Sequence, residues 1–164
     1  MLQLLHDLYR HMEWADAEAW RAVLATPAAE TDAALREKLL HIHSVQRGFL
    51  TVWSGNKPKW RELDSFADNR ELMEWGRAYY SELYPFLEQL DESRLDGAMI
   101  MPWVRHFMPD AAPTSFRDTL LQAAMHSAYH RGQVNMRLRE LGGEPTNVDY
   151  IMWGWKGKPQ PQWP

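Results

Sequence analysis

Residues 115–143, SFRDTLLQAAMHSAYHRGQVNMRLRELGG, contain the clearest helix pattern in the sequence. Apolar residues recur at steps of three and four, which is the spacing of one face of an α-helix. They are Leu120, Leu121, Ala124, Ala128, Val134, Leu138 and Leu141. Ser115 and Asp118 form a start like a capping box, although Glu or Gln is more usual at the second position. Gly142-Gly143 is a stop signal, so we predict one helix from Ser115 to Leu141.

Three further stretches with this periodicity predict helices over residues 2–24, 31–53 and 69–90. Asp32 is a suitable N-cap for the second of them. Pro85 lies inside the third pattern and favours a kink or an early stop there. Four long helices joined mostly by short loops indicate an all-α fold, an antiparallel four-helix bundle.

The connection between the third and fourth helices, residues 91–113, is longer and has no helical pattern. Its LDGAMIMPW segment predicts a short extended piece, and the connection could cross the end of the bundle. The stretch DYIMWGWKGKPQPQWP at 149–164 is rich in Trp and Pro and is not predicted to be helical. Disordered tails are usually poor in aromatic residues, so we expect this tail to pack on the bundle or on a second subunit. We therefore predict one domain over residues 1–152 and a tail over 153–164.

Composition argues against several classes of protein. The formal charge is −4, which provides no basic surface for nucleic acid. The sequence has no run of 18 apolar residues, so we expect no membrane span, and the N-terminal stretch lacks the apolar segment of a signal peptide. Cysteine is absent, which excludes disulfides, thiolate catalysis and Cys-based zinc sites. We expect a cytoplasmic protein that binds neither nucleic acid nor membrane.

Six of the seven histidines fall on predicted helices, and only His106 falls in a loop. His126 and His130 are four apart, so both imidazoles lie on one helix face and could share a metal ion. Such a pair alone is weak evidence, because histidines often lie at the edge of a core. The second helix offers a third ligand, and angular position around that helix slightly favours His43 over His41. Three histidines would leave a coordination position open, as in catalytic sites.

Other polar residues on the predicted helices allow both a functional and a structural role. His11 and Asp16 on the first helix could reach such a site as bases or as partners of its ligands. Glu13 is more readily explained as part of a solvated face. Arg131 has the planar fork that suits a carboxylate, and we favour a structural pairing with an acid across the bundle. No Ser-His-Asp order, P-loop or dinucleotide fingerprint is present.

Two segments resemble the motifs of the DinB-like superfamily. The segment HSAYHRGQVNMRLRELGGEP resembles its closing motif, a histidine pair followed by Arg-Gly-Gln and then Leu-Arg-x-Leu-Gly and Pro. The segment LLHIHSVQRGFLTVW resembles its other motif, a histidine followed five residues later by an acidic or polar residue. His41 and Gln46 have that spacing, with Gln in place of the commoner Glu or Asp. EWADAEAW in the first helix also resembles a family segment, and the resemblance covers roughly residues 2–152.

The resemblance implies a DinB-like four-helix bundle, often dimeric, that holds a divalent metal with three histidines. Carried over by position, the ligands are His41, His126 and His130, which leaves His43 as a residue beside the site. Such a set suits zinc or nickel, and also iron. Because some relatives transfer low-molecular-weight thiols, we expect a metal-dependent transferase or hydrolase, with no catalytic side chain assigned. The alternative is a non-catalytic bundle that binds metal or a small ligand as a dimer.

Overall fold

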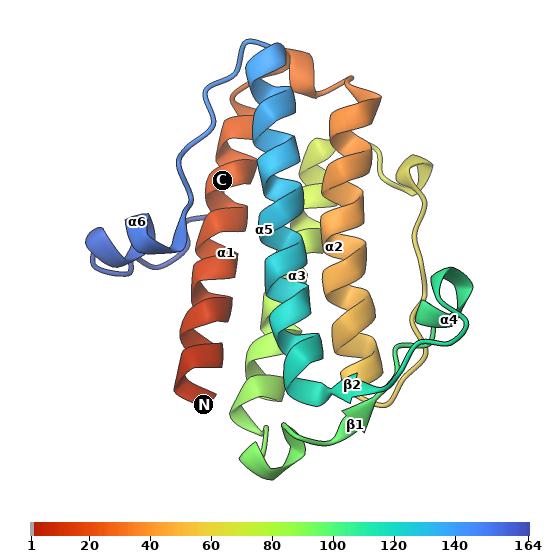
Figure 1. Cartoon of the computed structure of the whole chain (residues 1–164). Coiled ribbons are helices and arrows are strands. Elements are labelled where there is room, and N and C mark those ends of the chain that lie inside the picture. The colour runs from red at the N-terminus through yellow and green to blue at the C-terminus, as the bar shows by residue number, and fades with distance from the viewer. Residues whose placement is uncertain (1) are drawn as a thin grey trace.

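The computed structural model describes residues 2–164, and four long helices packed side by side form its body (Figure 1). They are α1 (Leu2–Leu24), α2 (Ala33–Trp53), α3 (Asn69–Glu88) and α5 (Phe116–Glu140). Helix α5 lies against α1 and α2, and α3 lies against the same two helices. The predicted all-α four-helix bundle is therefore confirmed. None of the described helices is long and apolar enough to cross a membrane.

The helices begin and end close to the predicted residues because local signals are strong. The side chain of Asp32 accepts a hydrogen bond from the Leu35 amide and caps α2. Ser115 and Asp118 form the predicted capping box at the start of α5. Pro85 does not end α3 early, because it lies in the last turn and the helix continues to Glu88.

The direction of the helices follows from two connections. Helices α1 and α5 run one way and α2 and α3 run the other, because residues 54–68 return along the length of the bundle before α3 begins (Figure 1). That segment includes the short turn η2 (Leu63–Ser65). The ends of the bundle are filled by two apolar clusters, one around Tyr9, Trp53 and Leu120 and the other around Trp20 and Leu39.

The connection between α3 and α5 contains short pieces of regular structure. Strands β1 (Ala98–Met99) and β2 (Thr114–Ser115) pair antiparallel, which confirms the predicted extended piece. Helix α4 (Val104–Phe107) was not predicted, and it includes His106, so placing that histidine in a loop was wrong. Four residues are too few to show a helical period, which explains the error. Two further short turns are η1 (Pro27–Ala29), between α1 and α2, and η3 (Glu92–Arg94), between α3 and β1.

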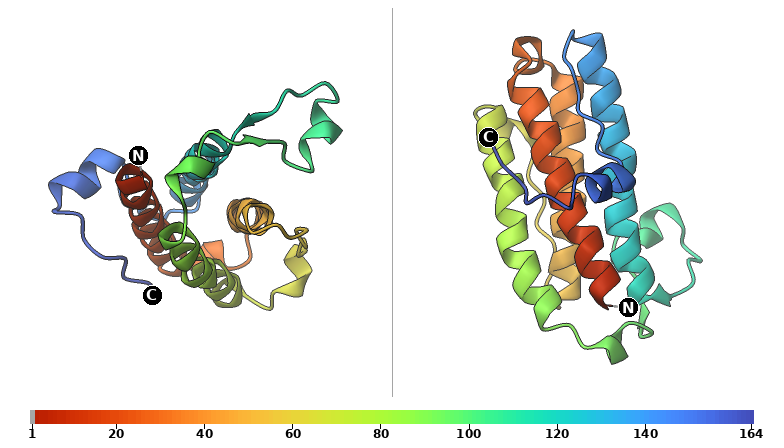
Figure 2. Two further views of the ribbon diagram at one scale, coloured as in Figure 1. Left: turned by 90° about the horizontal axis from the view of Figure 1, so that it is seen from below. Right: turned by 90° about the vertical axis from the view of Figure 1, so that its left-hand side faces the viewer.

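The C-terminal segment packs against the bundle on the side opposite α4 (Figure 2). Lys158 Nζ lies 2.6 Å from Asp7 Oδ2, and Trp163 Nε1 donates to Glu13 Oε1 over 3.1 Å. This confirms that the tail packs on the bundle. The prediction that it lacks helix was wrong over α6 (Tyr150–Trp155), a six-residue helix whose Trp153 is buried.

Candidate metal centre

Three histidine side chains converge between α2 and α5. His126 Nε2 lies 3.2 Å from His41 Nε2 and 3.1 Å from His130 Nε2. One ring nitrogen from each residue lies within 4.8 Å of the other two. Ligands of one tetrahedral zinc ion at about 2.0–2.1 Å from the metal are themselves about 3.3 Å apart. The structure therefore brings His41, His126 and His130 into a cluster that could hold a metal ion.

The hydrogen bonding of His130 presents the correct nitrogen to this cluster. Its Nδ1 lies 3.0 Å from Gln133 Oε1, which can only accept, so Nδ1 carries the proton. The Nε2 lone pair is then free to face the other two imidazoles. Outer contacts of this kind fix the tautomer of histidines that bind metals.

The surroundings of the cluster also favour uncharged imidazoles. Partial burial, together with the neighbouring His130 and His41, lowers the pKa of His126 to about 4. Partial burial, followed by the charge of His130, also lowers the pKa of His41. Neutral imidazoles keep the lone pairs that metal binding requires.

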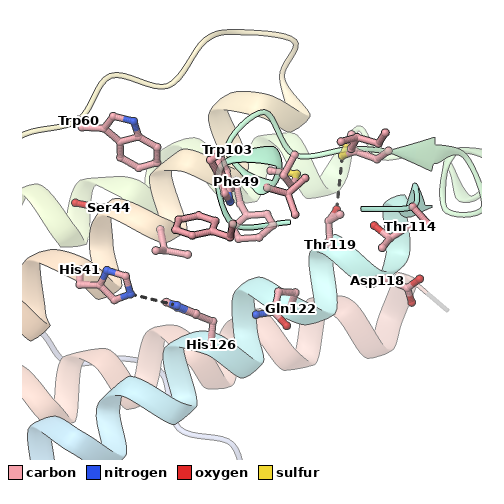
Figure 3. A pocket seen from close by; sticks show the side chains of 17 residues that line it. His41, Ser44, Phe49, Trp60, Trp103, Thr114, Asp118, Thr119, Gln122 and His126 are labelled. Atoms are coloured by element: carbon pink, nitrogen blue, oxygen red, sulfur yellow. Dashed lines mark hydrogen bonds between the residues drawn. The ribbon is translucent and has the colours of Figure 1, made fainter. Parts of the chain in front are cut away.

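The cluster opens onto a pocket of about 740 Å³ that His41 and His126 help to line (Figure 3). The pocket lies between α2, α5 and the two long connections. Its walls are mostly apolar, and Phe49, Trp60 and Trp103 contribute their aromatic rings. The positions of Trp60 and Trp103 were not predicted, because both residues come from irregular segments that no periodicity places.

His43 lies outside the cluster. It is buried, its Nε2 accepts from Trp20 Nε1 over 2.8 Å, and its Nδ1 lies 2.8 Å from Gln46 Oε1. Both ring nitrogens are therefore used by the protein. Angular position around α2 slightly favoured His43 because that side chain faces the core. The structure places His41 in the cluster instead.

Asp16 is the centre of a buried polar network and does not point at the histidines. Gln46 Nε2 donates to its Oδ2 over 2.7 Å, and Arg131 Nη1 donates to its Oδ1 over the same distance. Tyr80 OH also donates to Oδ2, over 2.5 Å. The structural pairing that we favoured for Arg131 is thus present. Glutamine at position 46 also fits, because a Glu there would place a second buried negative charge beside Asp16.

The remaining polar candidates of α1 contact the C-terminal segment. His11 Nε2 lies 2.8 Å from the Val148 carbonyl oxygen, and its ring packs beside Tyr150. Glu13 accepts hydrogen bonds from Tyr84 and Trp163. Neither residue lies in the histidine cluster, and the contacts of both hold the residues after α5 on the bundle. The expectation that Glu13 belongs to a solvated face was wrong, because its partly buried carboxylate is hydrogen-bonded by two side chains.

The architecture and the cluster together define a helical-bundle protein with a candidate three-histidine metal site. The chain belongs to the DinB family, whose model matches residues 1–160. This confirms the family resemblance seen in the two histidine motifs. Among curated proteins, no significant match was found.

Proposed function

We propose that this protein is a divalent-metal-dependent enzyme, a thiol-dependent transferase or a hydrolase, whose metal is held by His41, His126 and His130. The observation that carries the proposal is the opening of the three-histidine cluster onto the apolar pocket. A bound ion would supply an open coordination position and would favour the deprotonated form of a thiol or of water. Zinc or nickel suits three imidazoles best, and iron is a further candidate.

The side chains around the cluster support this role. Ser44 and Gln122 line the pocket beside His41 and His126, and neither side chain makes a hydrogen bond within residues 2–164. They are available to orient the polar part of a substrate. A substrate bound against the apolar walls would displace water from the cluster, and exclusion of water strengthens charge interactions.

Metal binding and turnover test the proposal directly. The protein, stripped with a chelator, is titrated with zinc or nickel in a calorimeter, and metal content is measured by elemental analysis. The loaded protein is then assayed for conjugation of common cellular thiols to 1-chloro-2,4-dinitrobenzene. We expect turnover that is lost in His130→Ala and retained in His106→Ala, which removes an exposed histidine of α4. A protein that holds no metal, and whose melting temperature zinc and nickel do not raise, would overturn the proposal.

One observation favours a second candidate function, a non-catalytic bundle that binds metal or a small ligand. Among residues 2–164, Asp118 is the only ionisable residue that lines the pocket besides His41 and His126. Its carboxylate is already used at the α5 cap, where Ser115 N donates to it over 3.2 Å. The described part of the pocket therefore offers no carboxylate that lacks a hydrogen-bond partner. This alternative predicts metal binding without conjugation of any thiol or hydrolysis of any ester, and detection of either reaction would rule it out.

We also propose that the protein forms a homodimer. Met125, Tyr129 and Met136 are each more than half exposed and lie on one face of α5, where they offer an apolar surface to a second copy. We expect light scattering after size exclusion to give the mass of a dimer. A monomer mass at micromolar protein concentration would contradict the expectation.

A further inference from the structure

Aromatic rings gather at one part of the pocket next to the candidate metal centre. Trp60 comes from the connection after α2, Trp103 precedes α4, and Phe49 lies on α2 (Figure 3). The ring centroids of Trp60 and Trp103 are 5.7 Å apart, and those of Phe49 and Trp103 are 5.3 Å apart. Both pairs meet edge to face, an arrangement that aromatic rings prefer. The three rings form a connected aromatic wall.

Gly48 makes room for this wall. A Cβ atom at position 48 would lie 2.7 Å from a ring carbon of Trp60 and 3.5 Å from a ring carbon of Trp103. Any other residue would therefore push Trp60 away from α2. Glycine inside a helix costs roughly 0.5–1 kcal/mol relative to alanine. Its presence in the interior of α2 is a signal in the sequence for a close approach of this kind.

Core packing does not account for the position of Trp60. Its side chain is 52% exposed, so much of the indole surface faces the pocket or solvent. Phe107, which also lines the pocket, is 82% exposed. Large exposed apolar side chains that line a cavity mark a binding site more often than a folding requirement.

Two polar side chains of the pocket lie close to the histidines, whereas Thr114, Asp118 and Thr119 line the part farther from them (Figure 3). Gln122 is one turn from His126 on α5, and Ser44 is one turn from His41 on α2, so each lies on the same helix face as a histidine. The described residues that line the pocket include no Lys or Arg, so none of them would pair with a second negative charge of a ligand.

We propose that the pocket takes a flat apolar ligand, aromatic in its body, that carries one metal-binding head group. The body lies against the wall of Trp60, Trp103 and Phe49, and the head lies at the histidine cluster beside Gln122. The role of the head rests on the proposed function, because it requires a metal. Recognition of the body requires only the aromatic wall, in which Trp60 packs closely over Gly48.

Two thiols that differ in the body attached to sulfur test the proposal, 2-naphthylmethanethiol and ethanethiol. Naphthalene fluorescence reports binding of the first, and competition reports binding of the second, with apo and zinc-loaded protein. We expect the naphthyl thiol to bind at least ten times more tightly than ethanethiol in both forms. Gly48→Ala and Trp60→Ala should each reduce that preference about tenfold, because both remove the aromatic surface from α2.

Gly132→Ala is the matched control for the glycine substitution. Gly132 lies inside α5, and a Cβ there meets nothing within 4 Å, so the preference should not change. If Gly48→Ala does not fold by circular dichroism, Trp60→Ala alone decides the result. Equal affinities for the two thiols, or an unchanged preference in Trp60→Ala, would overturn the inference.

The two forms of the protein separate this inference from the proposed function. In one outcome, zinc does not bind the protein and does not raise its affinity for either thiol, but the apo protein still prefers the naphthyl thiol through Trp60. The proposed function then fails, and recognition of an aromatic body stands. If zinc raises the affinity for both thiols equally and the naphthyl group adds no further affinity, then the metal site stands and the inference about the ligand fails.

Discussion

Two histidines that are two residues apart on α2 have opposite surroundings. His43 is buried, and Trp20 and Gln46 use both of its ring nitrogens. His41 is exposed, and its Nε2 faces the Nε2 of His126. A histidine with two protein partners is complete without a ligand. Lone pairs that face one another are satisfied best by a cation, so hydrogen-bond accounting separates the two roles better than position around the helix.

The same contrast occurs between neighbours on α5. His130 faces the cluster, whereas the next residue, Arg131, points into the bundle and pairs with Asp16. Asp16 of α1 also accepts hydrogen bonds from Gln46 of α2 and Tyr80 of α3. The network thus joins all four long helices through one carboxylate. It fixes how α5 is rotated, and that rotation directs His126 and His130 toward α2.

The largest expected effect comes from removing the centre of this network. Asp16→Ala leaves the Arg131 charge buried without its partner and leaves the Tyr80 hydroxyl without an acceptor, while Gln46 Nε2 keeps only Ser127 Oγ. Breaking a buried ion pair in this way costs about 3–5 kcal/mol. Urea denaturation should therefore show a free energy of unfolding lower by about that amount.

The control for Asp16→Ala is Glu74→Ala, which removes an exposed ion pair with Arg77 whose N–O distance is 3.9 Å. Exposed pairs contribute about 0–1 kcal/mol, so this variant should unfold almost like the wild type. Equal losses in the two variants would mean that the buried network holds the helices no more strongly than a surface contact does.

Removing His41 tests the comparison of the two α2 histidines at the one that faces the cluster. His41→Ala deletes one of three candidate ligands while leaving the core untouched, because the side chain is exposed. We expect zinc affinity to fall by about 100-fold or more, since the ligands share the free energy of metal binding. The stability of the apo protein should change by less than about 0.5 kcal/mol, as is usual for surface positions. Calorimetric titration and urea denaturation measure the two quantities on one sample.

His43→Ala should show the reverse pattern. The substitution leaves Trp20 Nε1 and Gln46 Oε1 buried without a partner, and each such loss costs about 1–3 kcal/mol. We expect the free energy of unfolding to fall by about 2 kcal/mol or more, while zinc affinity stays within tenfold of the wild type. A loss of zinc affinity as large as that of His41→Ala would remove the distinction between the two histidines.

The sequence predicts what is local and misses what depends on distant partners. The bounds of α1 and the Ser115–Asp118 cap follow from signals within a few residues, and the structure agrees with both. The family motifs select the three histidines, although periodicity alone favours His43. The contact of Trp60 with Gly48 could not be predicted, because it depends on the path of an irregular connection. Helix α6 is missed because six residues beside Pro and Gly give no clear period.

The smallest expected effect concerns a second Asp–Arg pair, formed by Asp32 at the start of α2 and Arg137 of α5. It allows a partly exposed pair to be compared with the buried pair of Asp16 and Arg131. Arg137 Nη2 donates to Asp32 Oδ2 over 2.6 Å, and this pair is partly exposed. The hydrogen bond from Arg137 holds the pKa of Asp32 below its ordinary value. The ionised carboxylate therefore stabilises the fold above about pH 4, and that contribution is lost as the pH falls through the lowered pKa.

Asp32→Asn isolates this charge, because Asn can still cap α2. At pH 6 the variant should be less stable than the wild type by about 0.5–1 kcal/mol, the range of partly exposed pairs. As the pH falls below the lowered pKa, the wild-type carboxyl becomes protonated, so the difference should shrink toward zero. Denaturation of both proteins at pH 6 and at a series of acidic pH values measures it. A difference that did not change with pH would mean that Asp32 acts through its cap alone, and that of the two Asp–Arg pairs only the buried Asp16–Arg131 contributes as a charge pair.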